Sequence, residues 1–420
     1  MDNNKNYNVI VVGGGAAGMM AALSAAELGA ATTLIEKNEK LGKKVFITGK
    51  GRCNVTNAGD TNDFFDNVLS NPKFLYSSVY GFDAFSVMEL IERYGCKLKI
   101  ERGNRVFPES DHSWDIINAF ENGLIQNKVN ILKNTRVSNL IINEADGIRY
   151  IRGVELDDKT KLYANKVIVA TGGKSYASTG SDGNFFKILE KHSVNITSMS
   201  PGLVPLVSSD LVCKKLMGLS LKNVSLDLYI DKKKIYSGFG EMLFTHFGIS
   251  GPLVLTASSI YSRKYNKMKA KAVIDLKPAL SVEKLEARLL REFEENKNKD
   301  IIKVIENLVP RSLAPIICER SCIDIHKKVN IITSKERLDI INTLKSFTID
   351  IVSTRDFDEA IITLGGISVK EINPSTMESK NIEGLYFAGE MIDVDATTGG
   401  YNLQIAWSTG RLAGISSIEN

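Results

Sequence analysis

The sequence predicts an α/β fold in which a parallel-sheet domain is interrupted by a β-rich part and a helical part. Strand–turn–helix patterns with glycine-rich turns lie near both ends of the 420-residue chain, at residues 8–37 and 384–413. Beyond residue 200 the sequence changes to short alternating runs and then to charged helical patterns. A chain of this length is expected to form two or three domains.

The first pattern begins with the apolar run Val9 to Val12, which leads into Gly13-Gly14-Gly15 and an alanine-rich helix. The spacing Gly13-x-Gly15-x-x-Gly18 suits a turn that binds a pyrophosphate. Gly13 permits the turn, Gly15 lets the backbone approach the phosphates, and Gly18 lets the helix pack on the strand. The free N–H groups and the positive end of the helix dipole then face the phosphates.

A second apolar run, residues 31–35, ends at Glu36, where a carboxylate can accept hydrogen bonds from ribose hydroxyls. This acid favours an adenosine without a 2′-phosphate. Strand, helix and acid together predict a dinucleotide site, without deciding between FAD and NAD.

Residues 38–60 are rich in Gly, Lys and Asn, and we expect a long ordered loop. Lys43, Lys44, Lys50 and Arg52 would give it a local positive field. Two interpretations stay open: a lid over the cofactor, which we favour because it follows a nucleotide motif, or a solvated basic loop.

The segment from residue 71 to 194 alternates between helical and strand patterns. We expect helices over 71–98, 113–126 and 184–191, with strands near 97–101 and over 129–132, 135–142, 148–156 and 161–164, the last four forming a β-meander. The buried strand 165–170 leads into Thr171-Gly172-Gly173, where a glycine pair lets the backbone approach a ligand.

The middle of the chain predicts a small β-rich domain followed by helices. Its alternating runs cover 224–230, 234–236, 242–245 and 270–276. Residues 281–345 are charged and helical, and we interpret their Lys and Glu runs as a solvated face.

The second glycine-rich pattern runs from the strand at Gly384 to Glu390, through a turn at Thr397 to Gly400, into a helix over 402–413. A long cofactor can use two helix N-termini. N–H groups near Tyr401 would lie against the pyrimidine edge of a flavin and stabilise its reduced form. Glu390 is suited to ribitol hydroxyls. Because NAD offers nothing of comparable length here, the residues favour FAD.

Bulk composition narrows the class of protein further. A net charge of only +4 argues against a nucleic-acid or membrane surface, and no apolar run reaches membrane-spanning length. The first residues, MDNNKNYN, lack the features of a signal peptide. Five cysteines without a C-x-x-C pair argue against a disulfide framework, and Cys318 and Cys322 are expected to be buried neighbours on one helical face rather than metal ligands. We expect a cytoplasmic protein without a metal site.

Several stretches carry a resemblance that spans almost the whole chain. GGGAAGMMAA, TGKGRCNVTN, ATGGKSYASTGSDG and TMESKNIEGLYFAGEMIDVDATTGGYNLQIAWSTG match in order, with LVPL and GEMLFTHFGISGP between them. They resemble bacterial NAD(P)/FAD-dependent flavoproteins that include aminoacetone oxidases and reductases of dehydro-bile acids. Ala177 departs from the family's usual proline at this position.

This resemblance implies a Rossmann-like FAD-binding domain of the glutathione-reductase type, interrupted by a β-barrel-like domain and a helical subdomain. The expected bounds are 1–194 and 363–420 for the FAD-binding domain, 195–280 and 346–362 for the β-rich substrate domain, and 281–345 for the helical subdomain.

The resemblance also implies a set of FAD contacts and places the loop with Arg52 and Cys53 near the isoalloxazine. Val137 would contact adenine through its backbone. We expect neither a nucleophilic role nor a covalent flavin bond for Cys53. The implied contacts are Gly13, Gly14, Gly15, Ala16, Ala17, Gly18, Glu36, Lys37, Arg52, Cys53, Asn54, Val137, Thr171, Gly172, Gly389, Glu390, Asp393, Gly400, Tyr401, Asn402 and Leu403.

The predicted activity is NAD(P)H-driven reduction of an activated C=C bond through flavin N5, with NAD(P)H as a transient donor. An amine oxidase that passes electrons to O₂ is the alternative; an RNA-modifying flavoprotein or a flavin redox sensor is disfavoured. The substrate and the oligomeric state stay open. Candidate residues for orienting substrate or moving protons are His246, Tyr401, Arg105, Tyr176, Glu241 and Thr245.

Overall fold

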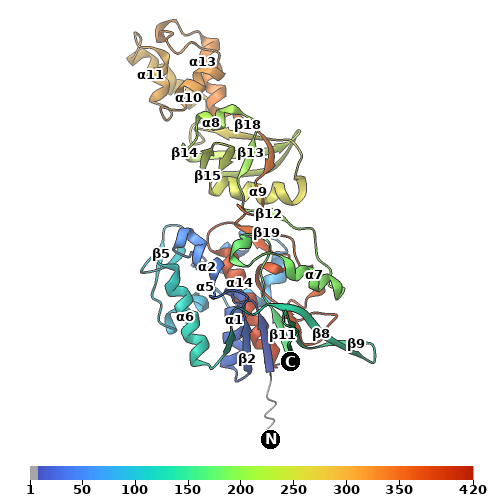
Figure 1. The fold of residues 1–420 in the computed structure, drawn as a ribbon. Coiled ribbons are helices and arrows are strands. Elements are labelled where there is room, and N and C mark those ends of the chain that lie inside the picture. The colour runs from blue at the N-terminus through green and yellow to red at the C-terminus, as the bar shows by residue number, and fades with distance from the viewer. Residues whose placement is uncertain (1–7, 420) are drawn as a thin grey trace. The chain divides into compact units, whose positions relative to one another are not determined.

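The computed structural model describes residues 8–419, which form two compact units (Figure 1). One unit contains the chain up to Pro201 and again from Phe357, and the other contains residues 202–356. The prediction about a signal peptide falls on residues that lie mostly outside the described part. Within that part, no helix is long and apolar enough to cross a membrane.

The first unit is built on a five-stranded parallel sheet in the order β20-β11-β1-β2-β7. Its central strand, β1, is almost wholly apolar and buried, as expected for a parallel strand covered on both faces. The strands are β1 Asn8–Val12, β2 Ala31–Ile35, β7 Asn130–Leu132, β11 Lys166–Val169 and β20 Leu385–Phe387.

The expected four-stranded meander is wrong in its first strand. β7 pairs in parallel with β2, with Leu34 opposite Ile131, and so belongs to the main sheet. The antiparallel meander has three strands, β8 Val137–Ala145, β9 Ile148–Leu156 and β10 Lys161–Tyr163. Strand periodicity alone does not tell which sheet a strand joins.

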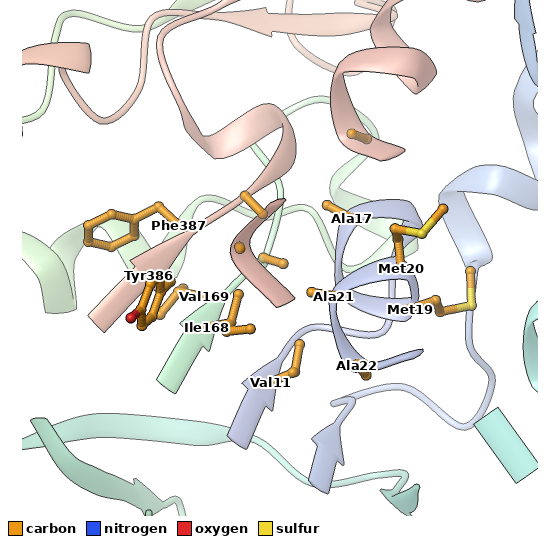
Figure 2. Close-up of a cluster of buried hydrophobic side chains, with 14 of the residues drawn as sticks. Val11, Ala17, Met19, Met20, Ala21, Ala22, Ile168, Val169, Tyr386 and Phe387 are labelled. Carbon is orange, nitrogen blue, oxygen red and sulfur yellow. The ribbon is translucent and has the colours of Figure 1, made fainter. Parts of the chain in front are cut away.

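Helix α1 (Ala16–Glu27) packs closely against α14 (Tyr401–Glu419) and joins the two ends of the chain. The contact depends on small residues: a Cβ atom on Gly410 would lie 2.5 Å from the carbonyl oxygen of Ala17, and one on Gly414 would lie 2.5 Å from that of Ala21. Figure 2 shows Ala17 and Ala21 among the buried side chains beside the sheet. The helix α14 also runs six residues past its expected end at Ala413.

The predicted loop over 38–60 is not wholly irregular. It contains the short helix α2 (Lys43–Ile47), the 3₁₀ turn Thr48–Gly51 and strand β3 (Thr56–Asn57). The predicted helix over 71–98 is also broken, because the Asp83 carboxylate accepts from the Ser86 N–H and starts a new helix. Its pieces are the 3₁₀ turn Pro72–Leu75, α4 Tyr76–Gly81 and α5 Ala84–Arg93.

The other elements of this unit are short apart from one long helix. Helix α6 has the bounds that the sequence predicts, and α7 likewise. These other elements are α3 Thr61–Asp66, β4 Val68–Ser70, β5 Leu98–Glu101, β6 Arg105–Pro108, α6 Ser113–Gln126, α7 Asn184–Lys191, β19 Ile362–Leu364 and β21 Asp395–Ala396, with β12 Ser200–Gly202 at the boundary between the two units.

The second unit contains a closed six-stranded barrel in the order β13-β16-β15-β14-β17-β18. Val224, Leu226 and Leu228 alternate into its core, as the sequence pattern predicts. The predicted fold class, a Rossmann-like domain with a barrel-like part and helices, is thereby confirmed. The strands are β13 Leu206–Ser208, β14 Ser220–Ile230, β15 Lys233–Thr245, β16 Gly248–Ser250, β17 Ala270–Asp275 and β18 Phe347–Thr354.

Helices complete the second unit and share one apolar core with the barrel. Leu285, Leu289 and Phe293 form the buried stripe of α10 at helical spacing. Helix α9, which contacts β15, was not anticipated from the sequence. The helices are α8 Leu211–Lys215, α9 Pro252–Tyr265, α10 Val282–Glu295, α11 Ile301–Glu306, α12 Ala314–Arg320 and α13 Ser334–Lys345.

Candidate cofactor site

The glycine turn after β1 has the geometry that its spacing predicts. Gly13 has a φ of +104°, and a Cβ there would lie 2.6 Å from the carbonyl oxygen of Ala170. A Cβ on Gly18 would collide with the carbonyl oxygen of Gly13, so this position allows α1 to pack on the turn. Both positions therefore require glycine for reasons internal to the fold.

Gly15 differs from these two glycines. Its φ of −82° is open to any residue, and a Cβ there would meet nothing within 4 Å. The fold itself thus has no need of glycine at the N-cap of α1. Open space beside the unbonded N–H groups of a first helical turn fits the pyrophosphate of a dinucleotide.

Glu36 is buried and organises the same turn. One carboxylate oxygen accepts from the Gly14 N–H at 2.7 Å, and the other accepts from the backbone and side chain of Asn38 at 2.8 and 2.7 Å. Val137, at the start of β8, is also buried. Glu36 thus stabilises the turn, and its predicted hydrogen bonds to a ribose would be a second role.

The segment Thr48–Asn54 is held in an unusual backbone conformation. Lys50 and Cys53 have φ values of +59° and +58°, which non-glycine residues rarely adopt. The Asn54 side-chain oxygen is buried without a hydrogen-bond partner among the described residues. A buried polar atom without a partner fits a site that a ligand would complete.

Arg52 is engaged within the protein rather than free to give a positive field. Its guanidinium bonds to Glu101 and Asp111 and lies 4.1 Å from the ring centroid of Phe107. The two carboxylates raise the pKa of Arg52, so it is charged at any accessible pH. The positive field expected of this loop is therefore reduced, since Lys44 is paired as well, while the lid over the cofactor stays a prediction.

Glu390, predicted for the ribitol, lies in a network of polar partners. Its carboxylate accepts from the Lys44 ammonium at 2.5 Å, the Ser175 hydroxyl at 2.7 Å and the Thr363 N–H at 2.8 Å. Lys44, Ser175 and Thr363 come from three distant segments. Sequence reasoning missed this network, because 346 residues separate Lys44 from Glu390 and no local pattern links them.

The start of α14 forms the second end of the candidate site. Gly400 has a φ of +103°, and a Cβ there would lie 2.5 Å from the Thr56 backbone. The first-turn N–H groups of Tyr401, Asn402 and Leu403 have no acceptor inside the helix. Asn402 uses its side chain structurally, bonding the backbone of Ala396 at 2.9 and 2.8 Å.

Tyr401 lies between the helix start and a row of aromatic rings. Its ring centroid is 6.1 Å from that of Phe64, and Phe65, Tyr76 and Tyr80 continue the row to exposed positions. Burial, together with the charge of Asp63, raises the pKa of the Tyr401 phenol, so it is protonated at neutral pH. The residue can donate a hydrogen bond.

The other predicted contacts come from the start of α1 and from the segments that follow β2, β11 and β20. A Cβ on Gly172 would lie 2.9 Å from the buried Ser181 hydroxyl, which has no partner among the described residues. The Lys37 ammonium pairs with Asp182 at 2.7 Å, and the Asp393 carboxylate accepts from Thr197 at 3.1 Å. Of the remaining predicted FAD contacts, Thr171 and Ala16 are half-buried, and Gly389 and Ala17 are buried.

The catalytic candidates are not brought together within one unit. Arg105 is exposed beside Phe107, and Tyr176 is half-buried with a φ of +55°, just before the 3₁₀ turn Ala177–Thr179. Position 177 is the first residue of that turn, where proline and alanine both fit.

Glu241, Thr245 and His246 belong to the barrel unit. His246 is not among apolar residues as expected: it is exposed at the turn between β15 and β16, with its ring 4.9 Å from that of Phe247. Glu241 is exposed on β15. The Thr245 hydroxyl is buried and unpartnered among the described residues.

The cysteines allow a direct chemical prediction. Burial raises the pKa of Cys53 and Cys96 to about 12 and that of Cys318 to about 11, and it also raises the pKa of the buried Cys213, so these four thiols are protonated and inert at pH 8. Cys322 lies beyond the end of α12 and is exposed, so the expectation that Cys318 and Cys322 are buried neighbours on one helical face is wrong for Cys322. We expect a maleimide reagent to label the native protein once, and Cys322→Ser to abolish labelling, by mass spectrometry. Labelling of Cys53 in the folded protein would contradict this assignment.

The strand order of the parallel sheet, the glycine turn after β1 and the N-terminus of α14 together define the fold of an FAD-dependent oxidoreductase. The model of the HI0933-like protein Rossmann domain matches residues 7–416, and the chain belongs to this family of FAD-binding oxidoreductases. The resemblance seen in the sequence is thus confirmed. Among residues 8–419, no cluster of His, Cys, Asp and Glu could hold a metal ion.

Two relatives and one solved structure match nearly full length. The chain is 29% identical over 97% of its length to a 3-dehydro-bile acid delta(4,6)-reductase of Clostridium scindens, 98% of which is covered. It is 28% identical over 97% to a ribosomal RNA dihydrouridine synthase of Haemophilus influenzae, also 97% covered. Its structure is similar to that of a 3-ketosteroid delta1-dehydrogenase from Sterolibacterium denitrificans. The match covers 99% of this chain and 100% of that one, with a TM-score of 0.54 and 13% identity, which shows a shared fold.

Proposed function

We propose that the protein uses FAD to reduce a carbon–carbon double bond conjugated to a carbonyl group. The observation that carries this is the pairing, in one unit, of the glycine turn with the start of α14. The activities of the two relatives support the reaction class, because a 3-oxo-4,6-diene and the uracil ring each contain such a bond.

When bound, FAD supplies hydride transfer at N5, with NAD(P)H as a transient donor. Residues of this chain would do the rest. The N–H groups at Ala16–Gly18 and Glu36 would hold the ADP end, and those at Tyr401–Leu403 would favour negative charge at the flavin end. Thr171, Gly172, Glu390 and Asp393 would position the part between, and the β-rich domain would supply substrate specificity.

Two substrate classes fit this chemistry. One is a small molecule with an enone, which the sequence predicts. The other is a uridine in RNA, which the similarity to the ribosomal RNA dihydrouridine synthase of Haemophilus influenzae supports. The exclusion of nucleic acid from a net charge of +4 is not supported, because a second relative, from Escherichia coli, is also a ribosomal RNA dihydrouridine synthase at 26% identity.

The test uses anaerobic mixing of the purified yellow protein with NADH or NADPH. Bleaching within seconds, followed by reoxidation with a 3-oxo-4-ene steroid, supports the proposal. No bleaching, together with peroxide formed from aminoacetone, would replace it with the amine-oxidase alternative. Protein that neither contains FAD nor takes it up would refute the assigned cofactor.

His246 provides a prediction about the substrate side of the site. We expect His246→Ala to lower turnover about tenfold or more while bound FAD is unchanged, since a positioned imidazole contributes at least this much to proton transfer. His326→Ala, at another exposed histidine, is the control. Equal turnover in the two variants, measured with the flavin-reoxidation assay, would make His246 a surface residue without a catalytic role.

A further inference from the structure

The charge of the chain is divided unevenly between the two units. Residues 202–356 contain 26 lysines and arginines against 18 aspartates and glutamates, a net charge of +8. The rest of the chain therefore carries −4, and the modest total of +4 hides a basic barrel unit. A local excess of this kind attracts polyanions.

Much of this excess lies on one face, which we call the basic hairpin face. It consists of the exposed lysines Lys232–Lys234 at the turn between β14 and β15, and Lys264, Lys267, Lys269 and Lys271 around the end of α9 and the start of β17.

Strand pairing brings these two segments of the basic hairpin face together. Tyr229 lies opposite Lys271 on β17 and opposite Lys234 on β15. The Lys233 ammonium lies 5.8 Å from the ring centroid of Tyr265, at the end of α9. The lysines thus form one surface.

Few acids neutralise this surface. Asp227 pairs with Lys234 at 2.8 Å, Asp231 lies in the turn, and Asp350 is opposite Lys271. Lys232, Lys267 and Lys269 are exposed and take part in no ion pair among residues 8–419. These like charges repel one another, and a bound polyanion would relieve this repulsion.

Aromatic rings distinguish the partner. Tyr229 and Tyr265 are half-exposed between the lysines, and the Lys234 ammonium lies 6.0 Å from the Tyr229 ring. Proteins that bind unpaired nucleic acid usually contact its phosphates through basic side chains and stack its bases on aromatic rings. We infer that the basic hairpin face binds RNA at a looped region; the choice of RNA rests on the proposed uridine substrate.

The test measures binding directly, with a fluorescein-labelled RNA stem–loop that has uridines in the loop. The variant Lys232→Glu/Lys267→Glu/Lys271→Glu is compared with Lys284→Glu/Lys299→Glu/Lys335→Glu, the same charge change at exposed lysines of the helical part. We expect the first to weaken binding at least about tenfold and to reduce the salt slope by about three, with the second near wild type.

Further measurements separate the possible failures. Both variants should be bleached by NAD(P)H and reduce a free enone as wild type does, so loss of RNA binding cannot be confused with loss of the reaction. Equal binding by wild type and the first variant, or equal loss in both variants, would overturn the inference. Two further results together would also overturn the inference: normal RNA binding by a Tyr265→Leu variant, and binding of duplex DNA to the wild-type protein that is as tight as its binding of RNA.

Discussion

Replacing Gly15 by valine is expected to remove FAD from the protein while leaving the fold intact. A side chain at this position has no steric conflict in the protein alone, because a Cβ meets nothing within 4 Å and the φ of −82° suits any residue. The same side chain would occupy the space that the pyrophosphate needs against the first turn of α1. Flavin content should fall at least about tenfold, the equivalent of about 1.4 kcal/mol or more of binding free energy.

The experiment compares flavin absorbance per polypeptide with the thermal midpoint of the FAD-free protein. Gly15→Ala should give an intermediate loss. Gly81→Val is the matched control, because Gly81 also has open space and no positive φ, yet lies at the end of α4 rather than in the glycine turn. Normal flavin content in Gly15→Val would show that the pyrophosphate does not lie there. An unfolded variant would show that the open space is needed by the protein itself.

The nucleotide end of the site was predictable because its determinants are local. The run Val9–Val12, the three spaced glycines and Glu36 lie within one strand–turn–helix–strand unit, and the structure has that unit with β1, α1 and β2 nearly at the expected bounds. The residue type required at each of these positions depends on residues that are close to it in the sequence. Local patterns state such constraints directly.

The rest of the site depends on contacts between distant segments, which single-sequence patterns do not state. Lys44 seemed part of a basic loop, but it meets Glu390 through the fold. β7 has the pattern of a meander strand, yet it completes the parallel sheet. The sequence of helix α9 lacks a regular apolar pattern because it contains small polar residues such as Ser258 and Ser259. Both serines are buried, and their hydroxyls accept hydrogen bonds from the backbone N–H groups of Val204 and Leu203.

Charge provides the clearest instance of what a sum over the chain conceals. A total of +4 argued against a nucleic-acid surface, but the total combines a barrel unit of +8 with a remainder of −4. Only the division into units, and the strand pairing that gathers lysines around Tyr229 and Tyr265, shows where positive potential is concentrated. Net charge is informative for a domain and much less so for a chain of several domains.

Replacing Gly410 by valine is expected to separate the helices that join the two ends of the chain. A Cβ there would lie 2.5 Å from the carbonyl oxygen of Ala17, and that oxygen belongs to the backbone of α1 and cannot rotate away. Relief requires α14 to shift from α1, with loss of the contact that also involves Gly414 and Ala21. Overpacking of this kind costs about 1–3 kcal/mol, and a backbone conflict belongs at the upper end.

The helix shift should also weaken FAD retention, since the first turns of α1 and α14 would hold the opposite ends of one cofactor. The thermal midpoint is expected to fall by roughly 6–12 °C, taking about 2–4 °C per kcal/mol for a domain of this size, and flavin content should fall with it. Leu412→Val, which adds a β-branched residue to the same helix at a half-buried position, controls for helix propensity. A Gly410→Val protein with normal stability and a full complement of FAD would show that the two helices need not approach so closely, and would remove the structural reason for linking the two glycine-rich ends of the chain in one site.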